Sequence, residues 1–280
     1  DYPAYTVNQA LSVTEPVPRS DLDGEVATGT AKVRLLANPF PDMPKLHTEL
    51  FYKLRDRDYD IDRDGYLYVR GDGADQPDSA ATVYNTDHDY TSQTAGFEAS
   101  HRLPLRSKLT AGYAYEKIER RNAATEQTEE DRYTLKYRIQ PWSNFSARTE
   151  LEYGDRGADT YQWAQDYFAL LDTQLINATP DTQRYINHPE LRQYYLANRE
   201  RWEASADLSY LPEPRWNLNL NLKWRDDDYD KSTFGLTDAK WYRAHASASY
   251  AMSDDVSGSV YAGYDRYEGE QSSRAFRGGQ

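Results

Sequence analysis

Cysteine is absent from this sequence of 280 residues. The chain therefore offers no thiolates for disulfides, zinc or iron–sulfur clusters, and no C-x-x-C-H motif for covalent haem attachment. Long apolar runs are missing as well, since no stretch of about 18 apolar residues is available for a membrane-spanning helix. The mean hydropathy of -0.95 is low for a membrane protein. A transmembrane β-barrel remains compatible with both observations, because half of each barrel strand faces water.

Basic stripes and catalytic motifs are also lacking. The formal net charge is -13, which argues against nucleic acid as a partner. The five histidines show no H-E-x-x-H spacing, and neither a Ser/His/Asp order nor a glycine-rich phosphate loop can be recognised. We therefore expect that the protein is not an enzyme. No signal peptide is visible, so we expect a mature chain or a fragment.

Aromatic residues are abundant, with Tyr 25, Trp 6 and Phe 7. The stretch Trp216–Arg225 shows where they lie. Tryptophans bracket an alternation of leucine with asparagine and lysine, and alternation with period two is typical of a strand with one apolar and one polar face. An apolar band bounded by aromatic residues is typical of the outer surface of a transmembrane barrel, although a tyrosine-rich soluble β protein has a similar composition.

The same alternation recurs along the chain and predicts an all-β fold. We expect about ten antiparallel strands and no parallel ones, forming part of a larger barrel. The predicted segments are residues 32–37, 46–55, 95–99, 109–115, 133–139, 145–153, 202–210, 216–225, 242–250 and 256–265.

The connections alternate in length, which favours a barrel over a soluble sandwich. Short turns are expected at 38–44, 102–106, 140–144, 211–215 and 252–255, and long connections at 56–88, 119–130, 154–198 and 226–238. Outer-membrane barrels have short periplasmic turns and long extracellular loops. We expect a lead-in loop over 1–25, a barrel wall over 26–270 and a tail or loop over 271–280.

Two connections carry further patterns. Residues 161–172 have helical spacing, which predicts a short helix that caps its own loop or contacts a partner outside the cell. Asp60, Asp62 and Asp64 have the spacing of a calcium loop, but the twelfth position is Gly71. The alternative to a weak calcium site is a solvated acidic loop.

The alternation assigns side chains to the two faces of the wall. We expect these leucines to face lipid: Leu50, Leu109, Leu135, Leu151, Leu208, Leu218, Leu220 and Leu222. We expect these polar residues to face the lumen or a partner within it: Arg34, Glu49, Lys53, Glu116, Lys136, Arg138, Arg148, Glu150, Glu152, Glu203, Asp207, Asn219, Lys223, Arg225 and Arg243. Both signs of charge are mixed, whereas a ring of one sign would suggest an ion-selective pore. Such charges can pair with each other or with a protein inside the barrel.

Several segments taken in order resemble the MtrB/PioB family, over about residues 6 to 268. They are PRSDLDGEV (18–26), LPLRSKLTAGYAYEKIERR (103–121), EEDRYTLKYRIQP (129–141), ARTELEYGDRGADTY (147–161), LANRER (196–201) and DDDYDKSTFGLTDAKWYRAHASASYA (226–251). Each motif is loose, and their joint order carries the resemblance.

The resemblance implies a barrel in the outer membrane of a Gram-negative bacterium that sheathes a periplasmic multihaem c-type cytochrome in its lumen. An extracellular multihaem cytochrome would contact the long loops, and all haem would be carried by the partners. Family members are roughly twice as long or more, and many carry an N-terminal C-x-x-C that this sequence lacks. We therefore expect an internal portion of a longer barrel. The alternative function is a general or solute-specific porin.

Overall fold

The computed structural model describes residues 24–68, 81–162 and 190–273, and thirteen strands account for most of them. The strands are β1 (Glu25–Ala37), β2 (Leu46–Asp60), β3 (Gly65–Tyr68), β4 (Ala81–Tyr84), β5 (Tyr90–Leu103), β6 (Ser107–Arg120), β7 (Gln127–Trp142), β8 (Phe145–Ala158), β9 (Leu191–Arg192), β10 (Arg199–Tyr210), β11 (Trp216–Asp228), β12 (Phe234–Ala251) and β13 (Ser257–Ser272).

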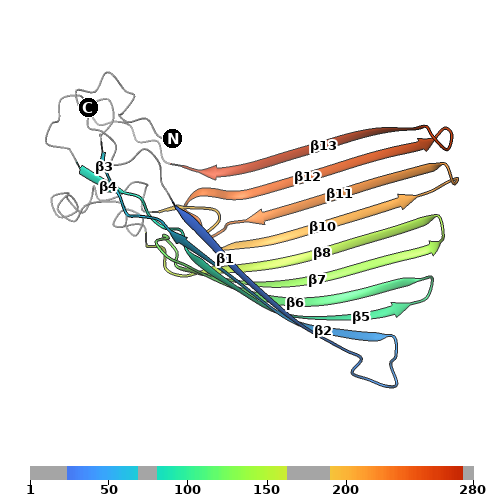
Figure 1. Ribbon diagram of the computed structural model, residues 1–280, viewed down its shortest axis with the longest axis horizontal. Coiled ribbons are helices and arrows are strands. Elements are labelled where there is room, and N and C mark those ends of the chain that lie inside the picture. Colours follow the sequence, from blue (N-terminus) through green and yellow to red (C-terminus); the bar gives the residue numbers. More distant parts are fainter. Residues whose placement is uncertain (1–23, 69–80, 163–189, 274–280) are drawn as a thin grey trace.

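Ten of these strands form one continuous sheet in chain order, β1-β2-β5-β6-β7-β8-β10-β11-β12-β13. Each strand pairs antiparallel with its neighbour, so the wall is an up-and-down meander (Figure 1). Within the described part of the chain, β1 pairs with β2 and β13 with β12, and no pairing closes the sheet. The prediction of about ten strands in an unclosed wall is confirmed.

The hairpin turns gather at one end of the sheet, to the right in Figure 1. The connections at 38–45, 104–106, 143–144, 211–215 and 252–256 all lie there, and we call it the short-turn end. Pro104 accepts hydrogen bonds from the backbone amide and the hydroxyl of Ser107, 3.2 and 2.7 Å away, which closes the turn after β5. The opposite end, to the left, is called the long-connection end.

The predicted lengths are wrong for two connections at that end. Strands β6 and β7 are joined by residues 121–126 alone, and β11 and β12 by 229–233. The sequence pattern predicts loops over the polar stretches 119–130 and 226–238. Backbone pairing nevertheless continues through them, because strand pairing beyond an apolar band does not require apolar side chains. The connections from β2 to β5 and from β8 to β10 are long, as predicted.

Two short features depart from the plain meander. Strand β9 pairs with β12 in parallel over two residues, which corrects the prediction of antiparallel strands only. Strands β3 and β4 form a separate two-stranded hairpin inside the β2–β5 connection. Most of the expected helix at 161–172, the lead-in to residue 23 and the tail from 274 lie outside the described residues.

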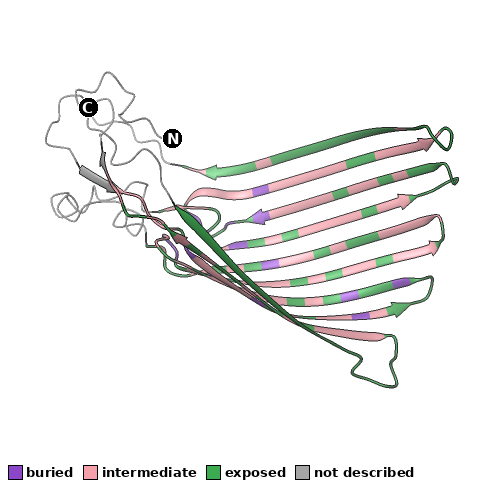
Figure 2. Cartoon of the chain, viewed as in Figure 1, coloured by how far each residue is buried: buried purple, intermediate pink, exposed green. Residues whose placement is uncertain are grey.

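Most side chains of the wall are exposed or half-buried, as expected for a single layer (Figure 2). The one cluster of buried apolar residues in the described ranges is Ala197, Tyr229 and Ala239, with Leu236 against it, at the long-connection end. None of the described residues belongs to a helix long and apolar enough to cross a membrane.

Candidate functional site

The strand register divides the side chains of the wall into two faces. Residues directly opposite one another in an antiparallel pair point to the same side of the sheet. One such row runs through Leu135, Leu151 and Ala204, and another through Leu208 and Leu220. All eight leucines that the sequence predicts to face lipid lie on this side, which we call the apolar face.

Two aromatic rows bound the apolar face. Near the long-connection end, the rings of Tyr113, Tyr133, Tyr153 and Trp202 follow one another across four strands, with centroids 5.2, 6.4 and 4.8 Å apart. Near the short-turn end the second row contains Trp142, Phe145, Tyr210, Trp216 and Tyr250.

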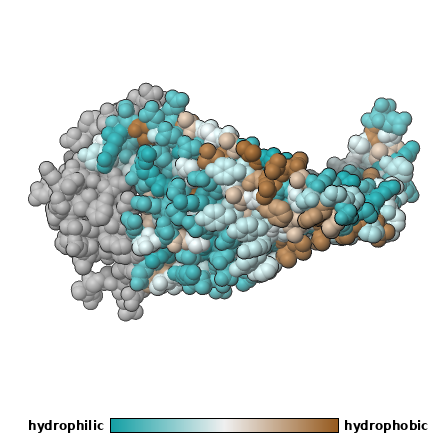
Figure 3. Space-filling model, turned by 90° about the horizontal axis from the view of Figure 1, so that it is seen from below, coloured by the Kyte–Doolittle hydropathy of each residue, from teal (hydrophilic) through white to brown (hydrophobic). Residues whose placement is uncertain are grey.

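The distance between these rows fits a bilayer. Along β8 the rows lie eight residues apart, from Phe145 to Tyr153, so the span is close to the roughly 9–11 residues with which a tilted strand crosses a bilayer. The lipid-facing band of an outer-membrane barrel is about 25 Å tall and has aromatic girdles at both edges. In Figure 3 the hydrophobic residues gather in the middle and toward the short-turn end, and hydrophilic residues cover the other end.

All fifteen residues predicted to face the lumen lie together on the opposite side, the polar face. Many form ion pairs between neighbouring strands, such as Lys223 with Glu203 and Arg243 with Asp265, 2.7 Å apart. Lys136 lies 3.6 Å from Glu150 and also reaches across β6 to Glu98, 3.2 Å away. Side chains on this face therefore lean toward one another over the sheet.

Glycines on the polar face leave the space that these side chains occupy. A Cβ at Gly112 would lie 2.7 Å from the Thr134 hydroxyl and 3.2 Å from Glu98. A Cβ at Gly154 would lie 2.9 Å from a Glu130 carboxylate oxygen. By contrast, a Cβ at Gly157, on the apolar face, would meet nothing within 4 Å. The polar face is the crowded one, as expected for the inside of a curved wall.

The long-connection end of the polar face holds a buried charge cluster that the sequence analysis missed. Asp227 is 3% exposed and accepts two hydrogen bonds from Arg201, with N–O distances of 2.5 and 2.8 Å. Arg225 lies 3.5 Å from the same carboxylate. Arg199 donates to Glu130 over 2.9 Å, which joins β10 to β7 across β8.

The segment before β10 folds over this cluster. The Arg156 guanidinium donates to the carbonyls of Tyr194 and Ala197, 2.6 and 2.9 Å away. Leu196 is 1% exposed and Tyr229 2%. Burial, with the nearby carboxylate of Asp227, raises the pKa of the Tyr229 hydroxyl. This end is therefore a buried structural junction, in which Nε of Arg199 is the atom of the cluster without a hydrogen bond.

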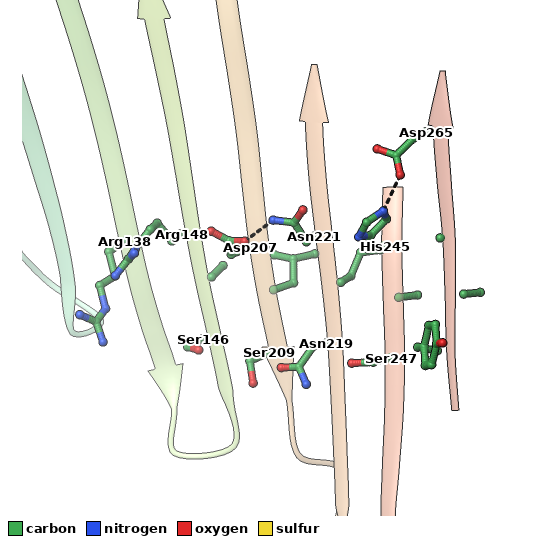
Figure 4. A pocket seen from close by; sticks show the side chains of 17 residues that line it. Arg138, Ser146, Arg148, Asp207, Ser209, Asn219, Asn221, His245, Ser247 and Asp265 are labelled. Carbon is green, nitrogen blue, oxygen red and sulfur yellow. Dashed lines mark hydrogen bonds and ion pairs between the residues drawn. The ribbon is translucent and has the colours of Figure 1, made fainter. Parts of the chain in front are cut away.

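The short-turn end is open. A hollow of about 800 Å³ lies over β7 to β13 and is lined by polar-face side chains, including Arg148, Asp207, Asn219 and His245 (Figure 4). Asp207 accepts a hydrogen bond from the Asn221 amide, and His245 lies 2.8 Å from Asp265. The alternation also puts Asn221, His245 and Asp265 on this side, but they were not among the predicted site residues, because their contacts with one another depend on the register.

Trp241 is a further polar-face residue that the sequence did not single out. Its ring centroid lies 5.6 Å from the Lys223 amine and 5.3 and 4.3 Å from the guanidinium carbons of Arg225 and Arg243. Three cations around one indole give a cation–π arrangement that holds them in place. All three also have carboxylate partners, so this group is internally balanced.

The acidic segment at 60–64 does not gather metal ligands. The Asn85 side chain accepts from the Asp64 amide over 2.7 Å and donates to the Asp62 carbonyl over 2.8 Å. Asp60, Asp62 and Asp64 all lie in the described ranges, where no three acidic or histidine side chains converge as metal ligands would.

The chain matches, over residues 2–280, the family described as "Putative outer membrane beta-barrel porin, MtrB/PioB". A relative in Shewanella baltica (strain OS185), "Outer membrane protein MtrB", is 28% identical over 189 residues. The match covers 68% of this chain and 25% of the relative, so the chain spans about a quarter of that protein's length.

Solved outer-membrane proteins give weaker matches. A loop-deletion mutant of OmpT from Vibrio cholerae has a TM-score of 0.39 at 8% identity, covering 88% of this chain and 94% of the other. OccK10 from Pseudomonas aeruginosa has a TM-score of 0.35 at 10% identity, covering 96% and 73%.

Proposed function

Because this chain belongs to the MtrB/PioB family of outer-membrane β-barrels, we propose that its polar face forms part of a sheath around a multihaem c-type cytochrome. The protein is an outer-membrane protein, and its sheet is a wall of transmembrane strands. The proposed sheath would hold the cytochrome in the bilayer and so let electrons cross the outer membrane.

The observation that carries this proposal is the contrast between the two faces. The apolar face has aromatic rows at a bilayer spacing, and the polar face is crowded with charges of both signs. Mixed charges at fixed positions suit a protein surface, because complementary charges set the orientation of a bound partner more than its raw affinity. A pore that selects one kind of ion instead uses a ring of one sign.

The chain itself would add no redox group. Without cysteine it has no site for covalent c-type haem, so haem would belong to the partner. Its part would be insulation by the apolar band and alignment by the polar face. The second partner, an extracellular cytochrome at the long connections, stays a prediction, because most of the β8–β10 connection lies outside the described residues.

A solute pore is the second candidate. The hollow near the short-turn end, about 800 Å³ and open to one side, favours it, as does the word porin in the family's description. A pore would have no need of a protein in its lumen.

Purification of the full-length barrel from outer membranes in mild detergent separates the two. The sheath proposal predicts that c-type haem absorbance co-purifies in a fixed ratio to the barrel. The control is a structurally unrelated porin taken through the same steps. A barrel that carries no haem and conducts ions in a planar bilayer would contradict the sheath and favour the pore.

A further inference from the structure

Four cationic side chains face one another across four neighbouring strands at the short-turn end of the polar face. Arg102 on β5 is directly opposite Lys108 on β6, which is opposite Arg138 on β7, which is opposite Arg148 on β8. All four are exposed. We call this set the basic row.

No acidic side chain in the described part of the chain forms an ion pair with any member of the basic row. Asp207 lies opposite Arg148 on β10, but its carboxylate is bonded to the Asn221 amide instead (Figure 4). Elsewhere on the same face, eight cations have carboxylate partners: Arg34, Arg132, Lys136, Arg199, Arg201, Lys223, Arg225 and Arg243. Other described polar-face cations form no ion pair either, and among them Lys32 and Lys53 face each other, but only the basic row continues over four strands.

Like charges directly opposite on paired strands destabilise a sheet. A shortage of acids does not explain the row, because the chain has 46 Asp and Glu against 33 Lys and Arg. The row therefore lowers the stability of the wall alone, without a compensating contact inside the described chain. A cost of this kind is expected where an outside group supplies the missing negative charge.

We propose that the basic row is the docking strip for an acidic surface of the protein held in the lumen. This inference rests on the proposed sheath and names the chemistry of the partner at the short-turn end. Four cations spaced roughly 4.8 Å apart extend over about 14 Å, so they match a line of carboxylates better than a single phosphate. The row lies on the face opposite the aromatic rows, which excludes lipid headgroups of the surrounding bilayer as its occupant.

The strip also determines the order of events in assembly. Exposed charges of one sign attract an opposite surface over distance and raise the rate of encounter, an effect that salt weakens. Once the acidic surface is seated, it removes the repulsion within the row. Partner binding then stabilises this end of the wall.

The test uses the full-length barrel in its complex, with the double variant Arg138→Glu and Arg148→Glu and the neutral variant Arg138→Gln and Arg148→Gln. The control, Lys117→Glu and Arg266→Glu, makes the same charge change as the first variant on the opposite face. Complexes are washed with increasing salt, and haem absorbance per barrel is measured. The unfolding temperature of each barrel stripped of haem protein is measured alongside.

We expect the glutamate variant to retain its haem partner on the order of tenfold less well than the wild type, with a smaller loss for the glutamine variant and none for the control. The stripped glutamine variant should unfold at the same temperature as the wild type or roughly 1–3 °C higher, because it lacks the like-charge contact.

Three results would overturn the inference. The first is full haem retention by the glutamate variant at every salt concentration, which leaves the sheath itself intact. The second is equal loss from the control, which indicates a general charge effect. The third is a lower unfolding temperature of the stripped glutamine barrel, which indicates a structural role. Absence of haem from the wild type would instead contradict the sheath, and with it this strip.

Discussion

Arg148 and Arg156 lie on the same strand and on the same face, eight residues apart, yet their surroundings differ completely. Arg156, at the long-connection end, donates to two backbone carbonyls of the segment before β10. Arg148, at the short-turn end, is exposed and lies opposite another arginine. Arg156 ties the segment before β10 to the wall, whereas Arg148 forms no ion pair within the described residues. Each arginine has one acidic and one arginine cross-strand neighbour: Glu130 and Arg199 for Arg156, and Asp207 and Arg138 for Arg148. The segment that folds over Arg156, and is missing above Arg148, therefore makes the difference.

The largest effect expected from this comparison is at Asp227. Replacing Asp227 with Ala leaves Arg201 and Arg225 without their shared carboxylate in a buried site. Loss of one partner from a buried pair should cost about 3 kcal/mol or more. The measurement is the urea midpoint of the barrel in detergent, compared with Asp228→Ala, the exposed neighbour on the other face. A change below about 0.5 kcal/mol, the range of ordinary surface substitutions, would show that this end is not a structural junction.

An arginine placed on the apolar face should differ from both Arg148 and Arg156, because it would face lipid. Leu220→Arg moves a charge into the band between the aromatic rows and should cost roughly 2 to 4 kcal/mol for insertion into a bilayer. The matched control is Asn219→Arg, one residue away on the polar face, with a change within about 0.5 kcal/mol. Folding into lipid vesicles measures both. Equal costs for the two variants would argue against opposite environments for the two faces.

Substitution of Arg156 should have an intermediate effect on the unfolding free energy. Arg156→Ala removes the donors to the Tyr194 and Ala197 carbonyls and should cost about 1 to 3 kcal/mol. It should also speed protease cleavage within 190–198, because the segment loses its attachment to the wall. Arg148→Ala is the control on the same strand, and its cleavage rate should match the wild type. Unchanged cleavage in Arg156→Ala would show that other contacts hold the segment.

The smallest effect should come from the exposed pairs. Arg243 and Asp265 are 37% and 45% exposed, so Arg243→Gln should change the unfolding free energy by only about 0 to 1 kcal/mol. The result gives the contribution of an ordinary exposed ion pair on the polar face to the unfolding free energy. A loss as large as that of Asp227→Ala would remove the distinction between the two ends.

The sequence predicted the wall well because alternation with period two is a direct consequence of strand geometry. It predicted one shared face for Arg138, Arg148 and the other thirteen polar residues, and the register places all fifteen on one face. It missed Arg102, which lies within the turn predicted at 102–106, and Lys108, which lies just before the strand predicted from residue 109, whereas β5 and β6 include both residues. Their basic residue type and their position beside a predicted turn were the sequence features that could have identified them.

Other features could not be read from one sequence, because they depend on which residues face each other. The Asp227 cluster joins β7, β10 and β11 through residues up to 97 positions apart, from Glu130 to Asp227. Strand pairing beyond the apolar band also leaves no hydropathy signal. For that reason the strand ends near 120 and 228 were assigned to loops, and the parallel contact of β9 was not expected.

We expect the polar face to contact a haem protein and the apolar face not to contact it. A photo-crosslinking amino acid placed at Asn219 or at Leu220, adjacent residues on opposite faces, tests this expectation most directly. After irradiation of intact outer membranes, adducts are separated under denaturing conditions and stained for covalently bound haem. A haem-bearing adduct is expected from position 219 and none from position 220. Adducts from neither position, or from position 220 alone, would contradict this expectation.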